Sequence, residues 1–151
     1  MKVQVVLVLV VGLLVGADKN EDKVKKELEK FQGEWVPVLA EINGTAVPYE
    51  GLKVVKVTVK GDQVTMKEGD QTAQATITLD PTEKPRRIDS TSKYSKGKEI
   101  KTTGIYEFDG GKLKVCYTLA GGQRPKEFST KGGTEGNPVF LIVYQRAKED
   151  K

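Results

Sequence analysis

The stretch FQGEW, residues 31–35, decides how this chain folds. It joins a charged, helix-like segment to the first strand-like segment, and it holds the only tryptophan of the chain, Trp35. Arg146 ends the last apolar run, near the other end of the sequence. A residue that begins the first strand and a residue that ends the last strand can meet only if the sheet closes on itself. We therefore predict that Gly33, Trp35 and Arg146 form a closure, with the guanidinium across the indole face in a contact worth about 0.5–2 kcal/mol.

Residues 1–17 have the pattern of a secretory signal peptide. Lys2 gives a positive start, residues 3–15 form an almost unbroken apolar run, and Ala17 ends a group of small residues suited to cleavage. The run is shorter than the ~20 apolar residues that cross a bilayer. We expect a secreted or periplasmic protein with no stable membrane span after cleavage. An uncleaved N-terminal anchor is the alternative.

The composition argues against several classes of function. The 25 basic and 21 acidic residues alternate along the chain, which is typical of a solvated surface and not of a nucleic-acid-binding one. The chain has no histidine, so Ser-His-Asp and Cys-His catalysis and the commonest metal ligand are excluded. The single cysteine, Cys116, can form neither an internal disulfide nor a zinc site, and we expect it to be buried and inert.

Carboxylates are the remaining candidates for acid–base chemistry. Asp89, Glu107 and Asp109 could pair in principle, but Asp109 is explained by a turn and Glu107 by a strand surface. We therefore predict that the protein is not an enzyme and that it uses no cofactor and no metal.

A short helix precedes a series of strands. Residues 18–32 place Val24, Leu28 and Phe31 on one face, which predicts an amphipathic helix that closes the barrel. A frayed linker is the alternative for residues 18–23. From Trp35 onward apolar and polar residues alternate in about eight segments, most of them separated by short turns such as DGGK at residues 109–112.

Neighbouring strands must run antiparallel because no helix separates any two of them. Eight up-and-down strands close into a barrel that is either filled by side chains or holds one small ligand. We therefore predict an all-β fold in which residues 33–151 form one antiparallel, up-and-down barrel of about eight strands. A two-sheet sandwich is the alternative, and the expected closure favours the barrel.

The mature chain resembles an uncharacterised family of small secreted lipocalin-like domains, abundant in planctomycete-type bacteria. The resemblance covers nearly all of the mature domain and depends on the order of several short motifs. These are FQGEW at 31–35, NGTAVP at 43–48, LDP at 79–81, PRRID at 85–89, GIYEF at 104–108, LKVCY at 113–117 and RPKEF at 124–128. It implies a lipocalin-like barrel and export from the cytoplasm. It does not imply a particular ligand, and the usual lipocalin disulfide is absent.

Binding is the function that these exclusions leave. Small residues on one strand would leave space inside the barrel, two tyrosines would offer amphipathic walls, and arginines near strand ends would meet a negative head group. The candidate ligand-binding residues are Tyr106, Tyr117, Arg124, Ala75, Ile77 and Arg87.

The predicted function is non-enzymatic binding of a small hydrophobic or amphipathic ligand, which can be anionic, by a secreted monomer. The alternative is a solid barrel that acts as a protein-interaction module of the envelope or extracellular space. An interior void above roughly 300 Å³ would favour the ligand carrier.

Overall fold

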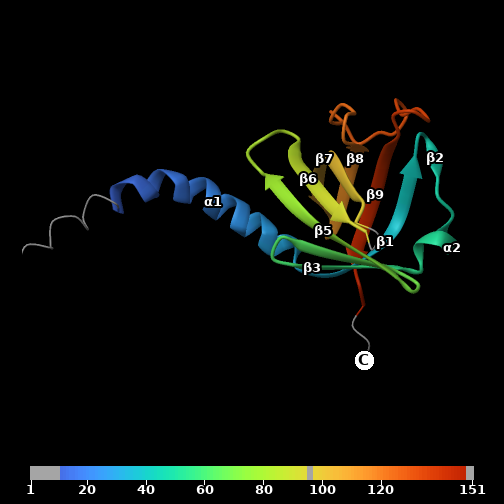
Figure 1. Ribbon diagram of the computed structural model, residues 1–151, viewed down its shortest axis with the longest axis horizontal. Helices are drawn as coiled ribbons and strands as arrows, with labels where there is room; N and C mark the ends of the chain where they lie inside the picture. Colours follow the sequence, from blue (N-terminus) through green and yellow to red (C-terminus); the bar gives the residue numbers. More distant parts are fainter. Residues whose placement is uncertain (1–10, 95–96, 149–151) are drawn as a thin grey trace, which may run out of the picture.

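The computed structural model describes residues 11–94 and 97–148, which form a closed β-barrel with one helix at its N-terminal end (Figure 1). In chain order the elements are α1 (Val11–Phe31), β1 (Gly33–Ile42), β2 (Thr45–Ala46), α2 (Tyr49–Leu52), β3 (Val55–Lys60), β4 (Gln63–Glu68), β5 (Gln71–Asp80), β6 (Arg86–Lys93), β7 (Glu99–Asp109), β8 (Lys112–Leu119) and β9 (Val139–Arg146).

The sheet follows the order of the chain and closes on itself. Strands β1 and β3 to β9 pair with their neighbours in antiparallel fashion, and β1 also pairs with β9. The result is a closed barrel of eight strands, to which β2 adds one extra two-residue strand beside β1. The predicted all-β, eight-stranded, up-and-down barrel is confirmed.

The closure lies where the FQGEW stretch places it. Trp35 and Arg146 are direct partners in the pairing of β1 with β9, and the guanidinium lies 4.0 Å from the centre of the indole ring. Gly33 has a φ of +107°, and a Cβ there would come within 2.9 Å of the Arg146 side chain. Trp35 is only 2% exposed. The predicted closure by these three residues is confirmed.

The end of α1 is fastened to this closure by hydrogen bonds. The indole Nε1 of Trp35 donates to the Phe31 carbonyl at 2.7 Å. Arg146 donates to the carbonyls of Gln32 and Lys30, the latter at 2.9 Å. These donors satisfy carbonyl groups that the end of a helix leaves without intrahelical partners. The end of α1 is therefore held against β1 and β9, where it closes one end of the barrel.

The helix is longer than predicted. It begins at Val11 rather than at residue 18, and only its last turns meet the barrel, where Leu28 and Phe31 pack against the core. Figure 1 shows the rest of α1 projecting away from the strands. Residues 1–10 of the expected signal peptide lie outside the described residues, whereas residues 11–17 continue the helix. In the described ranges, no helix combines the length and apolar character needed to cross a bilayer.

A second buried layer lies outside the barrel wall. Residues 120–138, between β8 and β9, cover Cys116, which is 0% exposed and points away from the barrel interior. Its Sγ lies 3.8 Å from the Ser129 carbonyl, and burial raises the pKa of the thiol. The expected burial of Cys116 is confirmed.

Candidate ligand-binding cavity

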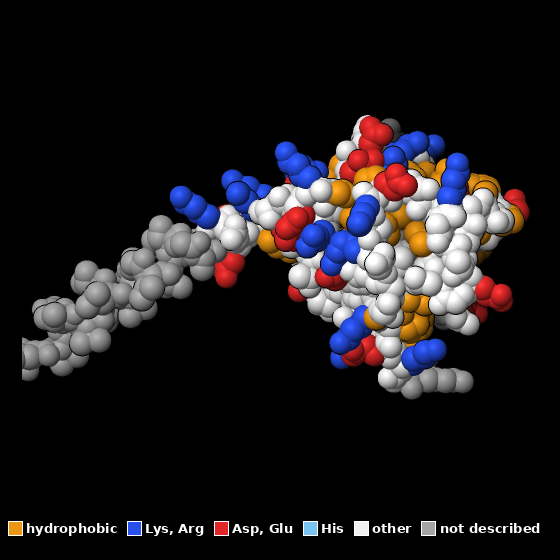
Figure 2. Space-filling view, turned by 90° about the horizontal axis from the view of Figure 1, so that it is seen from above, with side chains coloured by type: hydrophobic (Ala, Val, Ile, Leu, Met, Phe, Trp, Pro, Cys, Tyr) orange, Lys and Arg blue, Asp and Glu red, His pale blue; other side chains and the backbone are white. Residues whose placement is uncertain are grey.

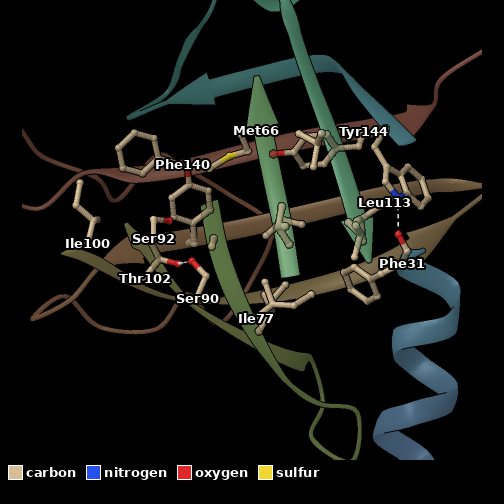
Figure 3. A pocket seen from close by; sticks show the side chains of 18 of the residues that line it. Phe31, Met66, Ile77, Ser90, Ser92, Ile100, Thr102, Leu113, Phe140 and Tyr144 are labelled. Carbon is tan, nitrogen blue, oxygen red and sulfur yellow. Dashed lines mark hydrogen bonds between the residues drawn. The ribbon is translucent and has the colours of Figure 1, made fainter. Parts of the chain in front are cut away.

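The barrel holds a cavity of about 360 Å³. Phe31 and Trp35 form its floor at the helix end, and Figure 3 shows the hydrogen bond that the Phe31 carbonyl accepts there. At the opposite end, Tyr94 and Leu119 line the cavity and are 43% and 38% exposed. The cavity therefore opens at the end of the barrel that is remote from α1.

Most of the wall is apolar because the strands alternate. Val57 and Val59 from β3, Met66 from β4 and Ile77 from β5 point inward, while the residues between them face solvent or the outer surface. Figure 3 shows Met66 and Ile77 around the same space. Among the described residues that line the cavity, none is charged.

A group of hydroxyls lies on the wall made by β6 and β7. Ser90 and Thr102 are register partners, and their side-chain oxygens are 2.7 Å apart in a hydrogen bond. Ser92, two residues further along β6, lies beside them (Figure 3). The cavity therefore has one polar strip on an otherwise apolar wall.

Tyrosines from β8 and β9 add two more hydroxyls. Tyr117 stacks on Phe140 with ring centres 5.0 Å apart and planes inclined by 12°. Burial raises the pKa of Tyr117 to about 12, with a smaller contribution from nearby Tyr94. Burial also raises the pKa of Tyr144, with a smaller contribution from nearby Tyr117. Both phenols therefore stay protonated and neutral at physiological pH.

Tyr106 does not line the cavity but lies beneath its floor. It is 1% exposed, it packs edge-on against Phe31 with ring centres 5.1 Å apart, and its hydroxyl donates to Glu27 of α1 at 2.8 Å. Burial, followed by the Glu27 hydrogen bond, raises the pKa of Tyr106. The structure thus corrects the expectation that Tyr106 forms a wall for ligand, because the helix end covers it.

Glu27 completes the contact between the helix and the floor. Burial by itself would raise the pKa of its carboxyl, but hydrogen bonds from Lys30 and Tyr106 outweigh burial and lower the pKa below its ordinary value. The Lys30 ammonium lies 2.6 Å from the carboxylate. Glu27 is therefore an ionised, fully paired anchor and not a free acid.

Arg124 and Arg87 lie outside the barrel, which corrects the expectation that they meet the head group of a ligand in the cavity. Arg124 donates to the Gly104 carbonyl at 2.7 Å and pairs with Asp89 at 2.8 Å. Asp89 faces outward because the alternation of β6 turns Ser90 inward. Both arginines border a separate external cleft of about 470 Å³ beside α1, at the closed end of the barrel.

The six residues predicted to bind ligand therefore divide into two groups. Ala75, Ile77 and Tyr117 line the cavity together. Tyr106, Arg87 and Arg124 do not.

Sequence reasoning missed the serines of β6, Thr102 and Tyr144. The signal was present in the spacing of Ile88, Ser90 and Ser92, which puts two small hydroxyls on the inward side of a strand.

Comparisons with family models, with curated proteins and with solved structures find no significant match. Within the described part of the chain, no cluster of three or more side chains could hold a metal ion. The function is therefore argued from the geometry of the cavity.

Proposed function

We propose that this protein is a non-enzymatic binding protein that carries a small apolar molecule inside its barrel. The observation that supports the proposal is the cavity of about 360 Å³, which lies within the ~300–1,000 Å³ of small-molecule sites. At about 30 Å³ per atom-sized group, the volume holds roughly a dozen non-hydrogen atoms. A longer molecule would extend through the mouth beside Tyr94 and Leu119.

The distribution of polar groups supports a binding role further. Small-molecule sites are mostly apolar with a few placed polar groups, and here a strip of hydroxyls interrupts a wall of valine, isoleucine, leucine and methionine. The floor is closed by the paired Trp35 and Arg146, so a ligand would enter from the opposite end.

We also propose that the domain is a lipocalin-like carrier that acts as a monomer after export. The support for export is the positive start and apolar run of residues 1–17. The support for a lipocalin-like carrier is the combination of that leader with an up-and-down barrel and the closure motif.

Native mass spectrometry of protein purified from its source tests the proposal, with extraction of any molecule that purifies with it. In parallel, the fluorescence of Trp35 reports binding directly, because this only tryptophan lines the cavity. We expect saturable uptake of at least one compound from a panel of fatty alcohols, isoprenoids and aromatic probes. A protein that purifies empty and takes up none of them would favour an interaction module instead.

A matched pair of variants on β5 locates the site. Ala75→Phe places a ring in the cavity and is expected to abolish uptake, whereas Thr76→Phe places the same ring on the outer face and is expected to leave uptake unchanged. Far-UV circular dichroism and urea unfolding confirm that both variants fold. Equal uptake by the two variants would place the ligand outside the barrel.

A further inference from the structure

We propose that the cavity selects uncharged ligands that carry a carbonyl or hydroxyl oxygen, and that it discriminates against carboxylates of the same size. This inference rests on the proposed binding function and names its ligand class. Two observations support it: several hydroxyls on the cavity wall have no hydrogen-bond partner in the described residues, and none of the described lining residues is charged.

Besides Tyr94 at the exposed mouth, three residues that line the cavity have hydroxyls without a protein partner in the described residues. They are Ser92, Tyr117 and Tyr144, whereas the Tyr106 hydroxyl below the floor is bound to Glu27. Among the described residues that are not exposed, no side-chain oxygen or nitrogen is both inaccessible and without a hydrogen-bond partner. The unpaired hydroxyls of these three residues are therefore accessible, and the residues themselves line the cavity. A ligand oxygen would therefore find donors that are not already committed.

The orientation of Tyr117 is set by its neighbours. The ring of Tyr117 stacks on Phe140. Its direct partner on β7 is Gly104, which has no side chain. A Cβ on Gly104 would come within 2.7 Å of the Tyr117 Cβ. The donor is thus held in place before a ligand arrives, which lowers the ordering entropy lost on binding.

Two charged groups at the closed end of the cavity are already engaged elsewhere. Glu27 lies beneath the floor and is paired with Lys30 and Tyr106. Arg146 lies against Trp35 and donates to main-chain carbonyls at the end of α1. Among described residues, neither of these two nor any other charged residue lines the cavity.

A carboxylate would therefore lose its hydration without gaining a counter-ion. Burial of an unpaired ionised group is strongly unfavourable, and such a group usually takes up a proton instead. The phenols of Tyr117 and Tyr144 donate to a carbonyl oxygen at any pH from about 5 to 8, because phenols titrate near pH 10 or above. A neutral ketone, ester or alcohol satisfies these donors without that penalty.

Matched ligands test this selectivity on the unmodified protein. Methyl nonyl ketone and decanoic acid have the same number of non-hydrogen atoms, which matches the roughly twelve that the cavity holds. In Trp35 fluorescence titrations at about pH 8, we expect the ketone to bind at least about tenfold more tightly than decanoate. As the pH falls toward about 5, the affinity for decanoic acid should rise by up to about tenfold per pH unit, while the affinity for the ketone stays constant.

Two variants test the tyrosine donors separately, and a third is the control. Tyr117→Phe and Tyr144→Phe remove only a hydroxyl and are expected to weaken ketone binding by about three- to tenfold each. Tyr49→Phe is the control, because Tyr49 is 63% exposed and lies away from the cavity. Urea unfolding of each variant confirms that the fold is retained.

The outcomes separate the two proposals. If neither ligand binds at either pH, the proposed function fails. If decanoate binds as tightly as the ketone at about pH 8, with no pH dependence, binding stands but the selectivity is overturned. If the ketone binds to all three variants with unchanged affinity, the hydroxyls do not contact it, and the assigned donor role is overturned.

Discussion

The barrel closure can be tested by replacing Arg146 with methionine, which keeps an unbranched apolar stem and removes the guanidinium. The change removes the stacking on Trp35, for which partly exposed pairs give about 0.5–1 kcal/mol. It also removes two hydrogen bonds to the carbonyls of Lys30 and Gln32 at the end of α1. Hydrogen bonds contribute about 0.5–1.5 kcal/mol each, and Arg146 is exposed, so we take the lower part of that range.

The sum predicts that Arg146→Met lowers the free energy of unfolding by about 1.5–3 kcal/mol. Urea unfolding, followed by both Trp35 fluorescence and far-UV circular dichroism, measures it. Arg87→Met is the matched control, because Arg87 is exposed and its ion pair with Glu83 is 3.5 Å long. We expect less than about 0.5 kcal/mol there. A loss of less than about 0.5 kcal/mol in Arg146→Met as well would refute the view that this closure holds the barrel.

Three further predictions concern acid stability, the thiol and the packing of β7. The pKa of Glu27 is lowered on folding, so the stability it contributes is present above its ordinary value of 4.5 and is lost as the pH falls through the lowered value. Urea midpoints measured from about pH 6 to pH 3 should therefore fall less steeply in Glu27→Gln than in the unmodified protein; equal slopes would contradict the linkage. The Cys116 thiol should react with a neutral-pH thiol reagent at least about a hundredfold more slowly in the native protein than in urea, and similar rates would show that it is not covered. Gly104→Ala should lower the free energy of unfolding by about 1–3 kcal/mol, because the new Cβ would lie 2.5 Å from the Cys116 carbonyl oxygen; an unchanged urea midpoint would show that the strands can separate without strain.

Much of the fold was readable from the sequence because strand alternation is a local signal. The segments around residues 55–60, 63–68 and 71–80 alternate clearly, and the turns between them contain glycine. Closure is not local, but the FQGEW stretch and Arg146 supplied a pair of residues that only a closed sheet brings together. The start of α1 was not predicted, because an apolar run such as residues 11–17 fits a signal peptide and a helix equally well.

The site was less predictable because it depends on which residues of each strand face the barrel interior and which face outward. Arg87 and Asp89 alternate with Ile88 and Ser90, so a shift of one residue decides whether a charge faces the cavity or the outside. Tyr106 lies on the inward face of β7, but it is too near the closed end of the barrel to meet a ligand. Depth along the barrel is not encoded in the two-residue period, so position at the floor or at the mouth required the structure.

The two ends of the barrel differ in a way that bears on its use. At the floor, the indole of Trp35, the guanidinium of Arg146 and the amide of Gln32 all bind main-chain carbonyls, and Figure 3 shows part of this floor. At the mouth, Tyr94 and Leu119 are exposed. Figure 2 shows basic and acidic side chains intermixed on one face of the molecule, with no single field of charge to draw in an anion. Segments with few buried contacts unfold locally at a lower free energy than segments held by many hydrogen bonds. A neutral molecule can therefore enter and leave at the mouth without disturbing the Trp35–Arg146 closure. A barrel with one hydrogen-bonded end, and a cavity whose described lining residues carry no charge, is therefore better suited to holding a neutral molecule than to capturing a charged one.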